Sequence, residues 1–354
     1  MENMMKNQIA WLEKPQKIVI RDAEIPKPKK NEVLIQAKYV GICGSDVAFF
    51  LDPTMHGRFH PEKPFILGHE VSGTIVGKGE DVTDLDLGER VAVEPGEPCG
   101  TCEFCRSGRY NLCRKMNFMA TSPFERGALC RYFTFPADWV FRLPENVDML
   151  QGAMMEPLAV GMAAAKKGEV TFDKTVVVLG TGCIGLMTIL ACRACGAVNI
   201  IAADVLDSRL ENAKEKGALH VVNSAAENVV DAVMKLTDGR GADVVFETAG
   251  TKFTTPVTCD LVRPGGRVVL VAQPKEPTPY DFFAMARKEA DVTGVFRYAN
   301  LYPAVLCAAA GGGADPASVV THTFPFEDVQ EAFERSAFDK EHVVKAAVCF
   351  EDEL

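Results

Sequence analysis

The sequence predicts an α/β protein with two domains, one rich in β-strands and one built on a doubly wound parallel sheet. Its 354 residues are about the length of two domains. Residues 1 to about 150 are rich in Gly, Pro and short β-branched runs, whereas residues 175 to about 294 alternate apolar strands with helices. A GxGxxG motif at residues 180–185 lies where the first of these later strands passes into a helix.

The β-rich part contains five short runs typical of strands separated by long loops. They are residues 17–21, 32–39, 73–76, 90–94 and 129–135. A single helix is expected at about residues 149–167.

From residue 175 the near-continuous apolar strands indicate a parallel sheet covered on both faces. The expected strands are 176–179, 199–203, 220–222, 243–247, 267–271 and 292–295, with helices at 184–195, 208–216 and 227–236. After about residue 298 a helix at 302–310, a strand at 321–324 and an amphipathic helix containing Val329, Ala332 and Phe333 indicate a return to the first domain.

Composition excludes several classes of function. The net charge is −10 and no long basic run is present, which argues against binding nucleic acid or anionic membrane surfaces. The start of the chain has no apolar signal core, and the apolar stretches are too short or too interrupted by Gly to span a bilayer. We therefore expect a cytoplasmic protein whose cysteines are thiols, metal ligands or core residues rather than disulfides.

Four of the twelve cysteines fall in one short loop, spaced C-x2-C-x2-C-x7-C. They are Cys99, Cys102, Cys105 and Cys113. Four close thiols in a reducing compartment are typical of a closed, structural zinc site. Most of the other cysteines lie in apolar surroundings and are expected to be core residues; these are Cys130, Cys183, Cys192, Cys195, Cys259, Cys307 and Cys349.

The GxGxxG motif predicts a dinucleotide site. Gly180 makes the tight turn, Gly182 lets the backbone approach a pyrophosphate, and Gly185 lets the helix pack on the strand. Asp204 follows at the end of the next strand, where a carboxylate binds ribose hydroxyls and repels a 2′-phosphate, so NAD is favoured over NADP. The alternative to ribose binding is that Asp204 caps the next helix. Arg209 nearby could bind a 2′-phosphate, which would weaken the preference for NAD.

A second metal site is indicated by residues scattered through the first domain. Cys43, His69, Glu70 and Glu156 together offer the ligands of an open, catalytic zinc site, which lowers the pKa of a bound hydroxyl. Taken singly, three of these residues have an ordinary alternative. Cys43 could be a core residue, His69 could form a local hydrogen bond, and Glu156 could be a surface carboxylate on a helix.

The order of these motifs resembles that of zinc-dependent medium-chain alcohol dehydrogenases nearly end to end. Residues 41–46 (GICGSD), 68–70 (GHE), the four-cysteine loop and GxGxxG carry this resemblance. Residues 119–122, 156–161, 294–298 and 321–325 resemble the sorbitol and xylitol dehydrogenase branch more narrowly. The resemblance implies a GroES-like catalytic domain (residues 1–160 and 298–354, with the four-cysteine loop at about 95–115) and a Rossmann domain (residues 161–297).

The resemblance also implies the residues of the reaction. Cys43, His69 and Glu70 would hold catalytic zinc, with Glu156 as a further ligand or linked through water. Phe118, Thr121, Arg297 and Tyr298 would line a polyol pocket. The cofactor would contact the glycine motif and several later segments, namely Gly180, Gly182, Ile184, Gly185, Asp204, Arg209, Val271, Ala272, Gln273, Val295, Phe296 and Arg297. The expected partners are a polyol or ketose and further copies of the chain, as a dimer or tetramer.

Two positions depart from the resemblance. Phe49 stands where animal sorbitol dehydrogenases have Tyr, and Ala48 stands where related alcohol dehydrogenases have the His that ends a proton relay. Ser45 is expected to take the alcohol proton, with capping of the following helix as its alternative role. Glu156 acting through water is the candidate for the last step of the relay, with His56 as the alternative.

Three functions compete on this basis. The first is NAD- and zinc-dependent oxidation of a polyol to a ketose. The second is a related dehydrogenase acting on a diol, an amino alcohol or an aromatic alcohol, against which the Arg297–Tyr298 pair argues. The third is a non-enzymatic protein that keeps the fold; it would be expected to have lost a zinc ligand, yet every expected ligand is present.

Overall fold

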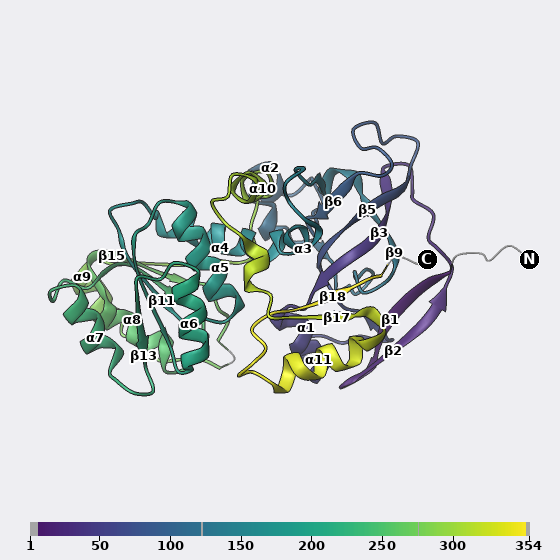
Figure 1. Ribbon diagram of the computed structural model, residues 1–354. Coiled ribbons are helices and arrows are strands. Elements are labelled where there is room, and N and C mark those ends of the chain that lie inside the picture. The colour runs from purple at the N-terminus through teal and green to yellow at the C-terminus, as the bar shows by residue number, and fades with distance from the viewer. Residues whose placement is uncertain (1–5, 122, 275, 352–354) are drawn as a thin grey trace, which may run out of the picture. The chain divides into compact units, whose positions relative to one another are not determined.

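The computed structural model describes residues 6–121, 123–274 and 276–351, which form two compact units (Figure 1). The first unit comprises Met1–Glu156 and Val320–Leu354, and the second comprises Pro157–Val319. Residues 157–160 and 298–319, expected from the sequence in the first domain, therefore group with the second unit. Ser122, the last residue of the 119–122 motif, lies outside the described residues.

The first unit is organised around β3 (Glu32–Gly41), which lies in the middle of a seven-stranded sheet. Strand β3 pairs antiparallel with β5 (Glu70–Lys78), β9 (Tyr132–Pro136) and β18 (Ala346–Cys349). The sheet continues from β5 through β6 (Arg90–Val93) to β10 (Val140–Arg142), and from β18 to β17 (His322–Pro325). Side chains of β3 such as Val33 and Ile35 are fully buried, which places this strand in the core of the unit.

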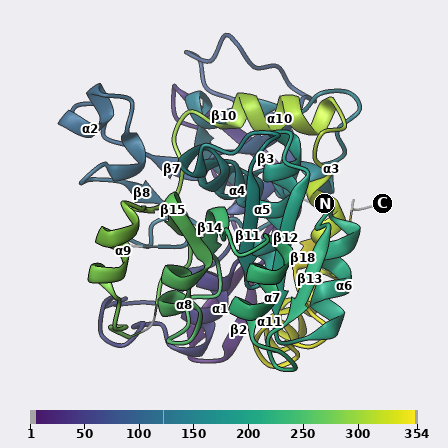
Figure 2. The same cartoon turned by 90° about the vertical axis from the view of Figure 1, so that its left-hand side faces the viewer.

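Smaller elements complete the first unit. A three-stranded sheet contains β2 (Lys17–Ala23), β1 (Asn7–Lys14) and β4 (Phe65–Ile66). Helix α11 (Val329–Phe338) packs against α1 (Gly44–Leu51), with the rings of Phe333 and Phe50 5.3 Å apart. Figure 2 shows α2 (Glu103–Arg106) on a projecting lobe, which joins the unit through the paired strands β7 (Gly96–Glu97) and β8 (Asn117–Phe118).

The helix expected at 149–167 is two helices. They are α3 (Met149–Ala153) and α4 (Met155–Gly168), with Met154 between them. Pro157 explains the break, because it has no N–H with which to continue the hydrogen-bond ladder onto the carbonyl of Ala153. Asp148 begins α3 as its cap, accepting a 2.8 Å hydrogen bond from the amide of Gln151.

The second unit confirms the doubly wound α/β prediction. Its six-stranded sheet has the order β13-β12-β11-β14-β15-β16, and every pairing is parallel. The strands are β11 (Thr175–Leu179), β12 (Asn199–Asp204), β13 (His220–Asn223), β14 (Ala242–Glu247), β15 (Val262–Leu270) and β16 (Asp291–Gly294). The strand order reverses between β11 and β14, and ligands bind such sheets at the carboxyl ends of the strands beside this point.

Helices connect the strands of the second unit. They are α5 (Cys183–Ala194), α6 (Asp207–Glu215), α7 (Val229–Leu236), α8 (Thr254–Leu261), α9 (Phe282–Lys288) and α10 (Tyr302–Ala310). Lys288 at the end of α9 donates to the carbonyls of Cys259 (2.6 Å) and Val262 (2.8 Å), so it satisfies carbonyls at the end of α8. Among the described residues, no helix is both long and apolar enough to cross a membrane.

Candidate active site

Three side chains of the first unit meet where two strands of its sheet end. Gly41, the last residue of β3, pairs with Glu70, the first residue of β5. This register brings Cys43, just beyond β3, to His69 and Glu70, and the ligand atoms of these three residues all lie within 4.8 Å of one another. His69 and Glu70 are 4 % and 1 % exposed, and Cys43 is half-buried.

Asp46 holds this cluster in place from α1. Its carboxylate accepts hydrogen bonds from the amides of Cys43 (3.0 Å) and Gly68 (3.1 Å), and it faces Nδ1 of His69 at 3.5 Å. Burial opposes the charged form, but His69 and the two amides hold the pKa of the Asp46 carboxyl below its ordinary value. An ionised Asp46 favours a proton on Nδ1 of His69, which leaves Nε2 for a metal ion.

A buried lysine that the sequence analysis missed contacts the same cluster. Lys345 forms an ion pair with Oε2 of Glu70 and donates a 3.0 Å hydrogen bond to the carbonyl of Ile42, and it is 3 % exposed. Little in the sequence indicated this contact, because Lys345 comes just before β18 and is far from Glu70 in the chain. Gly41 makes the space for this contact: a Cβ there would lie 2.0 Å from Oε2 of Glu70.

The cluster fits zinc on its own chemistry. One thiol, one imidazole and one carboxylate are ligands that catalytic zinc sites combine while leaving one position open. The His69 ring and the Glu70 carboxylate are 4 % and 1 % exposed, and polar groups this deeply buried suit a site that holds a cation. Cys43, His69 and Glu70 are therefore the residues that would hold the ion.

Other residues predicted for the reaction lie at differing distances from this cluster. Glu156 is 5 % exposed and lies in the first turn of α4, but it is not in the group whose ligand atoms lie within 4.8 Å, so its ligation of zinc stays a prediction. The ring of Phe118 lies 5.4 Å from that of His69, edge to face. Thr121, half-buried, donates to the carbonyl of Phe118 (3.4 Å) in the turn after β8.

Ser45 is not the helix cap considered from the sequence. Helix α1 begins at Gly44 with Cys43 as its cap residue, so Ser45 occupies the second position of the helix and is half-buried. Phe49, one of the two departures from the resemblance, is 1 % exposed. It packs among Phe59, Phe65 and Phe124, with ring centroids 5.2 to 5.7 Å from its own. Position 49 is thus part of an aromatic core.

The four cysteines of the lobe lie at the spacing that tetrahedral zinc requires. Metal–sulfur bonds of about 2.3 Å place the sulfurs of a tetrahedron about 3.8 Å apart. Sγ of Cys105 lies 4.0 Å from that of Cys99 and 3.5 Å from that of Cys102. The Cys113 sulfur accepts from the amides of Cys99 (3.3 Å) and Lys115 (3.4 Å), as a thiolate ligand would. The lobe therefore fits a closed, structural zinc site.

The glycine motif adopts the expected form at the carboxyl end of β11. Gly180 has a φ of +88°, and a Cβ on Gly185 would lie 1.9 Å from the Gly180 carbonyl oxygen, so both positions require glycine. A Cβ on Gly182 would meet nothing within 4 Å, which leaves the backbone open to a ligand. Helix α5 begins at Cys183, directly after this open position, and Ile184 lies in its first turn. The geometry is that of a pyrophosphate site at a helix N-terminus.

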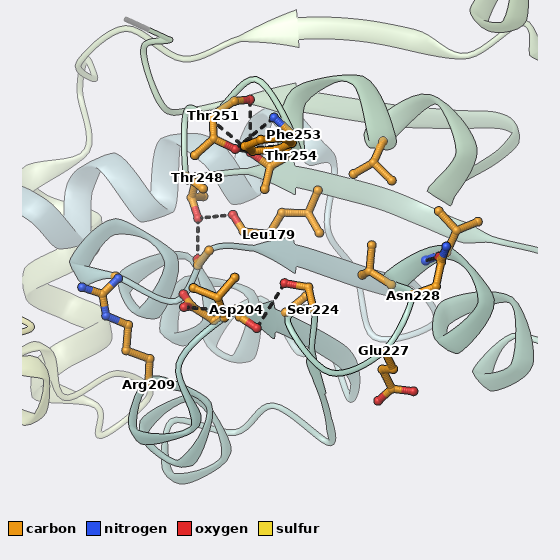
Figure 3. A pocket seen from close by; sticks show the side chains of 18 of the residues that line it. Leu179, Asp204, Arg209, Ser224, Glu227, Asn228, Thr248, Thr251, Phe253 and Thr254 are labelled. Carbon is orange, nitrogen blue, oxygen red and sulfur yellow. Dashed lines mark hydrogen bonds between the residues drawn. The ribbon is translucent and has the colours of Figure 1, made fainter. Parts of the chain in front are cut away.

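A cavity of about 840 Å³ adjoins this motif (Figure 3). Gly180, Gly182, Asp204 and Arg209 line it, as predicted for a cofactor site. The Asp204 carboxylate accepts hydrogen bonds from the amides of Thr181 (2.7 Å), Val205 (2.8 Å) and Leu206 (3.2 Å). This fixes the carboxylate at the wall of the cavity, in the position predicted to bind ribose. Asp204 does not cap the next helix, because α6 begins at Asp207 with Leu206 as its cap residue and no side-chain cap hydrogen bond.

Further residues line the cavity that sequence reasoning missed. Figure 3 shows Ser224 and Glu227 on the Asp204 side, and Thr248, Thr251 and Phe253 beside the end of β14. Ser224 and Thr248 directly follow β13 and β14. Because carboxyl ends of parallel strands meet at one edge of the sheet, their positions could have been inferred from the strand assignment. Glu227 and Phe253 carried no such signal.

The remaining predicted residues of the second unit lie outside this cavity lining. They are Val271, Ala272, Gln273, Val295, Phe296, Arg297 and Tyr298. Val271 and Ala272 follow β15, and their amides donate to the Glu247 carbonyl at 2.9 and 3.0 Å. The guanidinium of Arg297 lies 4.9 Å from the ring centroid of Phe296, which is 46 % exposed. Tyr298 is 5 % exposed and packs on Tyr302.

Glu94, just beyond β6, is a buried carboxyl that the sequence analysis did not single out. It is 3 % exposed and accepts a 2.7 Å hydrogen bond from the hydroxyl of Tyr110. Burial raises the pKa of Glu94 to about 7; the Tyr110 hydrogen bond lowers it, and the negative charge of Glu156 raises it further. Glu94 therefore changes charge near neutral pH.

Replacing this carboxyl should change how stability depends on pH. The pKa rises from 4.5 to about 7 on folding, so between these values the folded protein retains a proton that the unfolded chain has lost. The free energy of unfolding of the wild type should therefore fall as pH rises through this window, by about 3 kcal/mol. In Glu94→Gln the side chain cannot ionise, so the free energy of unfolding of this variant should not fall over the same pH range.

Urea unfolding of both proteins at pH 5 and pH 8 measures this effect. The stability of the variant relative to wild type should increase by about 3 kcal/mol between the two pH values. Glu62→Gln, at an exposed position of the same unit, provides a control that should show no such change. An equal difference between wild type and Glu94→Gln at both pH values would contradict the assignment.

Comparison with known proteins agrees with both the zinc-ligand clusters of the first unit and the glycine motif of the second. Residues 29–145 match the sequence model of the alcohol dehydrogenase GroES-like domain, and residues 183–310 match that of zinc-binding dehydrogenases. An uncharacterised zinc-type alcohol dehydrogenase-like protein of Escherichia coli is 43 % identical over 98 % of this chain and 100 % of its own. The sorbitol dehydrogenase of Bacillus subtilis is 38 % identical over 96 % of each chain.

The fold also matches a solved structure. A crystal structure of an E. coli oxidoreductase/dehydrogenase of unknown specificity superposes with a TM-score of 0.95 at 42 % identity, covering 98 % of this chain and 100 % of that one. Matches of this extent, together with the zinc-ligand clusters and the glycine motif, establish the family. The chain belongs to the zinc-binding alcohol dehydrogenases, with a GroES-like domain followed by a dinucleotide-binding domain.

Proposed function

We propose that the protein oxidises a secondary alcohol of a polyol to a ketose and transfers the hydride to NAD. The observation that carries this proposal is the cluster of half-buried Cys43 with buried His69 and Glu70, whose donor set fits catalytic zinc. The cavity beside the glycine motif supplies the cofactor half of the reaction. Similarity to a protein named sorbitol dehydrogenase supports the polyol class.

Zinc held by Cys43, His69 and Glu70 would polarise the alcohol oxygen and lower the pKa of the substrate hydroxyl. Asp46 fixes the His69 ring and the Cys43 amide, so it preorganises the ligands before substrate arrives. Ser45 takes the proton of the substrate hydroxyl and passes it to water near Glu156. Phe118, packed on the His69 ring, helps to exclude bulk water.

The residues proposed to contact the polyol are Phe118, Thr121, Arg297 and Tyr298, as the resemblance to polyol dehydrogenases implies. Several polar partners suit a molecule with a hydroxyl on every carbon, whereas a diol, an amino alcohol or an aromatic alcohol would not need them. Phe49 has no hydroxyl and is buried among aromatic rings, so that position offers the substrate no hydrogen-bond partner.

A panel of substrates tests the proposal. NAD reduction should occur with at least one of xylitol, sorbitol, ribitol and arabinitol, with kcat/KM at least tenfold above that for butanediol or benzyl alcohol. A zinc chelator should abolish the activity, and added zinc should restore it. Absence of NAD reduction with every C4 to C6 polyol, from neutral to alkaline pH, would refute it.

The charge of Asp204 should set the preference for NAD. Asp204→Ala removes the carboxylate that faces the cofactor cavity. Since like charges near a protein surface repel by roughly 1–4 kcal/mol, the ratio of kcat/KM for NADP to that for NAD should rise by roughly 10- to 100-fold. Glu227→Gln, which neutralises another carboxylate of the same cavity, is the matched control and should change the ratio less. An unchanged ratio in Asp204→Ala would contradict this role.

We further propose that the enzyme works in the cytoplasm as a homodimer or homotetramer. Supporting features are a cysteine-rich chain whose cysteines are all free thiols in the structure, and exposed apolar side chains on the second unit, including Phe282 and Phe283. Analytical ultracentrifugation tests the assembly. A single species of about 38.5 kDa at micromolar concentration would contradict it.

A further inference from the structure

A hydrogen bond from Tyr110 links the four-cysteine lobe to Glu94, outside the lobe. The short helix η1 (Tyr110–Leu112) lies between Cys105 and Cys113, and the amide of Cys113 donates to the Tyr110 carbonyl at 2.9 Å. The backbone of Tyr110 is thereby tied to a candidate zinc ligand. Its side-chain hydroxyl points out of the lobe and donates to Oε1 of Glu94 at 2.7 Å.

Trp139 fixes both partners of this hydrogen bond. The amide of Glu94 donates to the Trp139 carbonyl at 2.9 Å, and the rings of Tyr110 and Trp139 pack edge to face with centroids 4.9 Å apart. Glu94 itself is 3 % exposed. A buried carboxylate with a fixed backbone and a fixed donor has little freedom to move.

Glu94 also lies near the candidate catalytic residues. The charge of Glu156 acts on Glu94, and both carboxyls are almost fully buried. Pro95 continues the chain from Glu94, and its carbonyl accepts from the amide of Met119 at 3.1 Å. The residue before Met119 is Phe118, whose ring packs on His69. A shift of Glu94 and Pro95 would therefore displace Met119 and its neighbour Phe118, which packs on His69.

We propose that Tyr110 is a positioning residue through which the four-cysteine lobe acts on the catalytic centre, because its hydroxyl holds Glu94 and the adjoining Pro95, which contacts Met119 next to Phe118. The lobe then has a second role beyond pinning a loop. Zinc bound in the lobe would keep Tyr110 in position, and Tyr110 keeps the Glu94 carboxyl and the adjoining contact between Pro95 and Met119 in place. This inference rests on the proposed function for its turnover readout.

Tyr110→Phe tests it with the smallest possible change. The variant keeps the ring packing on Trp139 and loses only the hydroxyl. We expect kcat for polyol oxidation to fall roughly tenfold, with KM for NAD within twofold and zinc content unchanged. The pH at which Glu94 ionises should rise by about one unit, because a hydrogen bond that favours its charged form is gone. Tyr110 and Glu156 are the titratable groups that act on Glu94, so the shift can be assigned.

A double-mutant cycle and a matched control make the test specific. Tyr110→Phe should have little further effect in the Glu94→Gln background if Tyr110 acts through Glu94. Arg114→Ala removes an exposed ion pair with Glu103 on the same lobe and should leave kcat and its pH profile unchanged. Wild-type kcat and pH profile in Tyr110→Phe, or fully additive effects in the double variant, would overturn the proposal.

Failure of the proposed function can be told apart from failure of this inference. If the wild type oxidises no polyol, the proposed function fails, whereas the Tyr110–Glu94 contact remains testable by stability. The pH dependence of unfolding should then differ between wild type and Tyr110→Phe, and this difference should vanish in the Glu94→Gln background. If it does not, the inference fails independently of the reaction.

Discussion

Cys43→Ser and His69→Ala should each lower polyol oxidation at least about 1000-fold and reduce bound zinc from two ions per chain to one. The expectation follows from the chemistry of the site, since zinc can lower the pKa of a bound hydroxyl from about 15.7 to about 7, and without it the substrate hydroxyl stays protonated. Cys43 and His69 supply two of the three ligand atoms that lie within 4.8 Å of one another.

Steady-state kinetics with metal analysis measures this outcome. Asp46→Asn should give an intermediate result, a roughly 10- to 100-fold loss, because Asp46 orients His69 without offering a ligand atom to the cluster. Cys130→Ala is the matched control, a buried cysteine of the same unit outside both clusters. Near-wild-type kcat/KM in Cys43→Ser, or two zinc ions still bound, would show that the cluster is not the catalytic site.

Cys113→Ser should empty the lobe of zinc and lower the unfolding temperature by at least about 5 °C. Structural zinc contributes about 10–16 kcal/mol in small zinc-binding peptides, and even a few kcal/mol corresponds to several degrees in a unit of this size. Cys113 is the most buried of the four ligands, and its sulfur accepts two backbone hydrogen bonds, so a hydroxyl cannot replace it.

Differential scanning calorimetry and limited proteolysis follow this change. Cleavage should appear between residues 97 and 117, because this segment should unfold when zinc no longer links its cysteines. Cys307→Ser, at an exposed cysteine, should leave both measurements at wild-type values. Retention of full thermal stability by a zinc-depleted lobe would mean that the four thiols have another purpose.

Much of the fold was predictable because strong local patterns agreed with the tertiary structure. Apolar strands with a glycine turn after β11 specify a parallel sheet, and the sheet has the strand order expected of it. The cysteine spacing predicted a four-sulfur cluster, and the structure brings those sulfurs together. The grouping of Cys43, His69 and Glu70 came from resemblance, and strand register explains it afterwards.

Other features depend on contacts that no local pattern records. Helices α8 and α9 were missed, since α8 carries three Thr and a Pro, which are weak helix formers, and α9 is short. The expectation that Cys195 and Cys307 are core residues was wrong: both are exposed, because apolar neighbours in sequence do not determine which face of a helix is buried. Lys345 and Glu94 reach their partners only through tertiary structure.

The discontinuous first unit has a consequence for biosynthesis. Strand β18 lies between β3 and β17, with Val348 paired to Val40, and Lys345 just before it contacts Glu70. A ribosome adding about 5–20 residues per second must therefore finish the whole second unit before the central sheet of the first can close. During that interval the edge of β3 and the Glu70 carboxylate lack their partners, so the nascent chain should be most prone to aggregation and degradation late in translation.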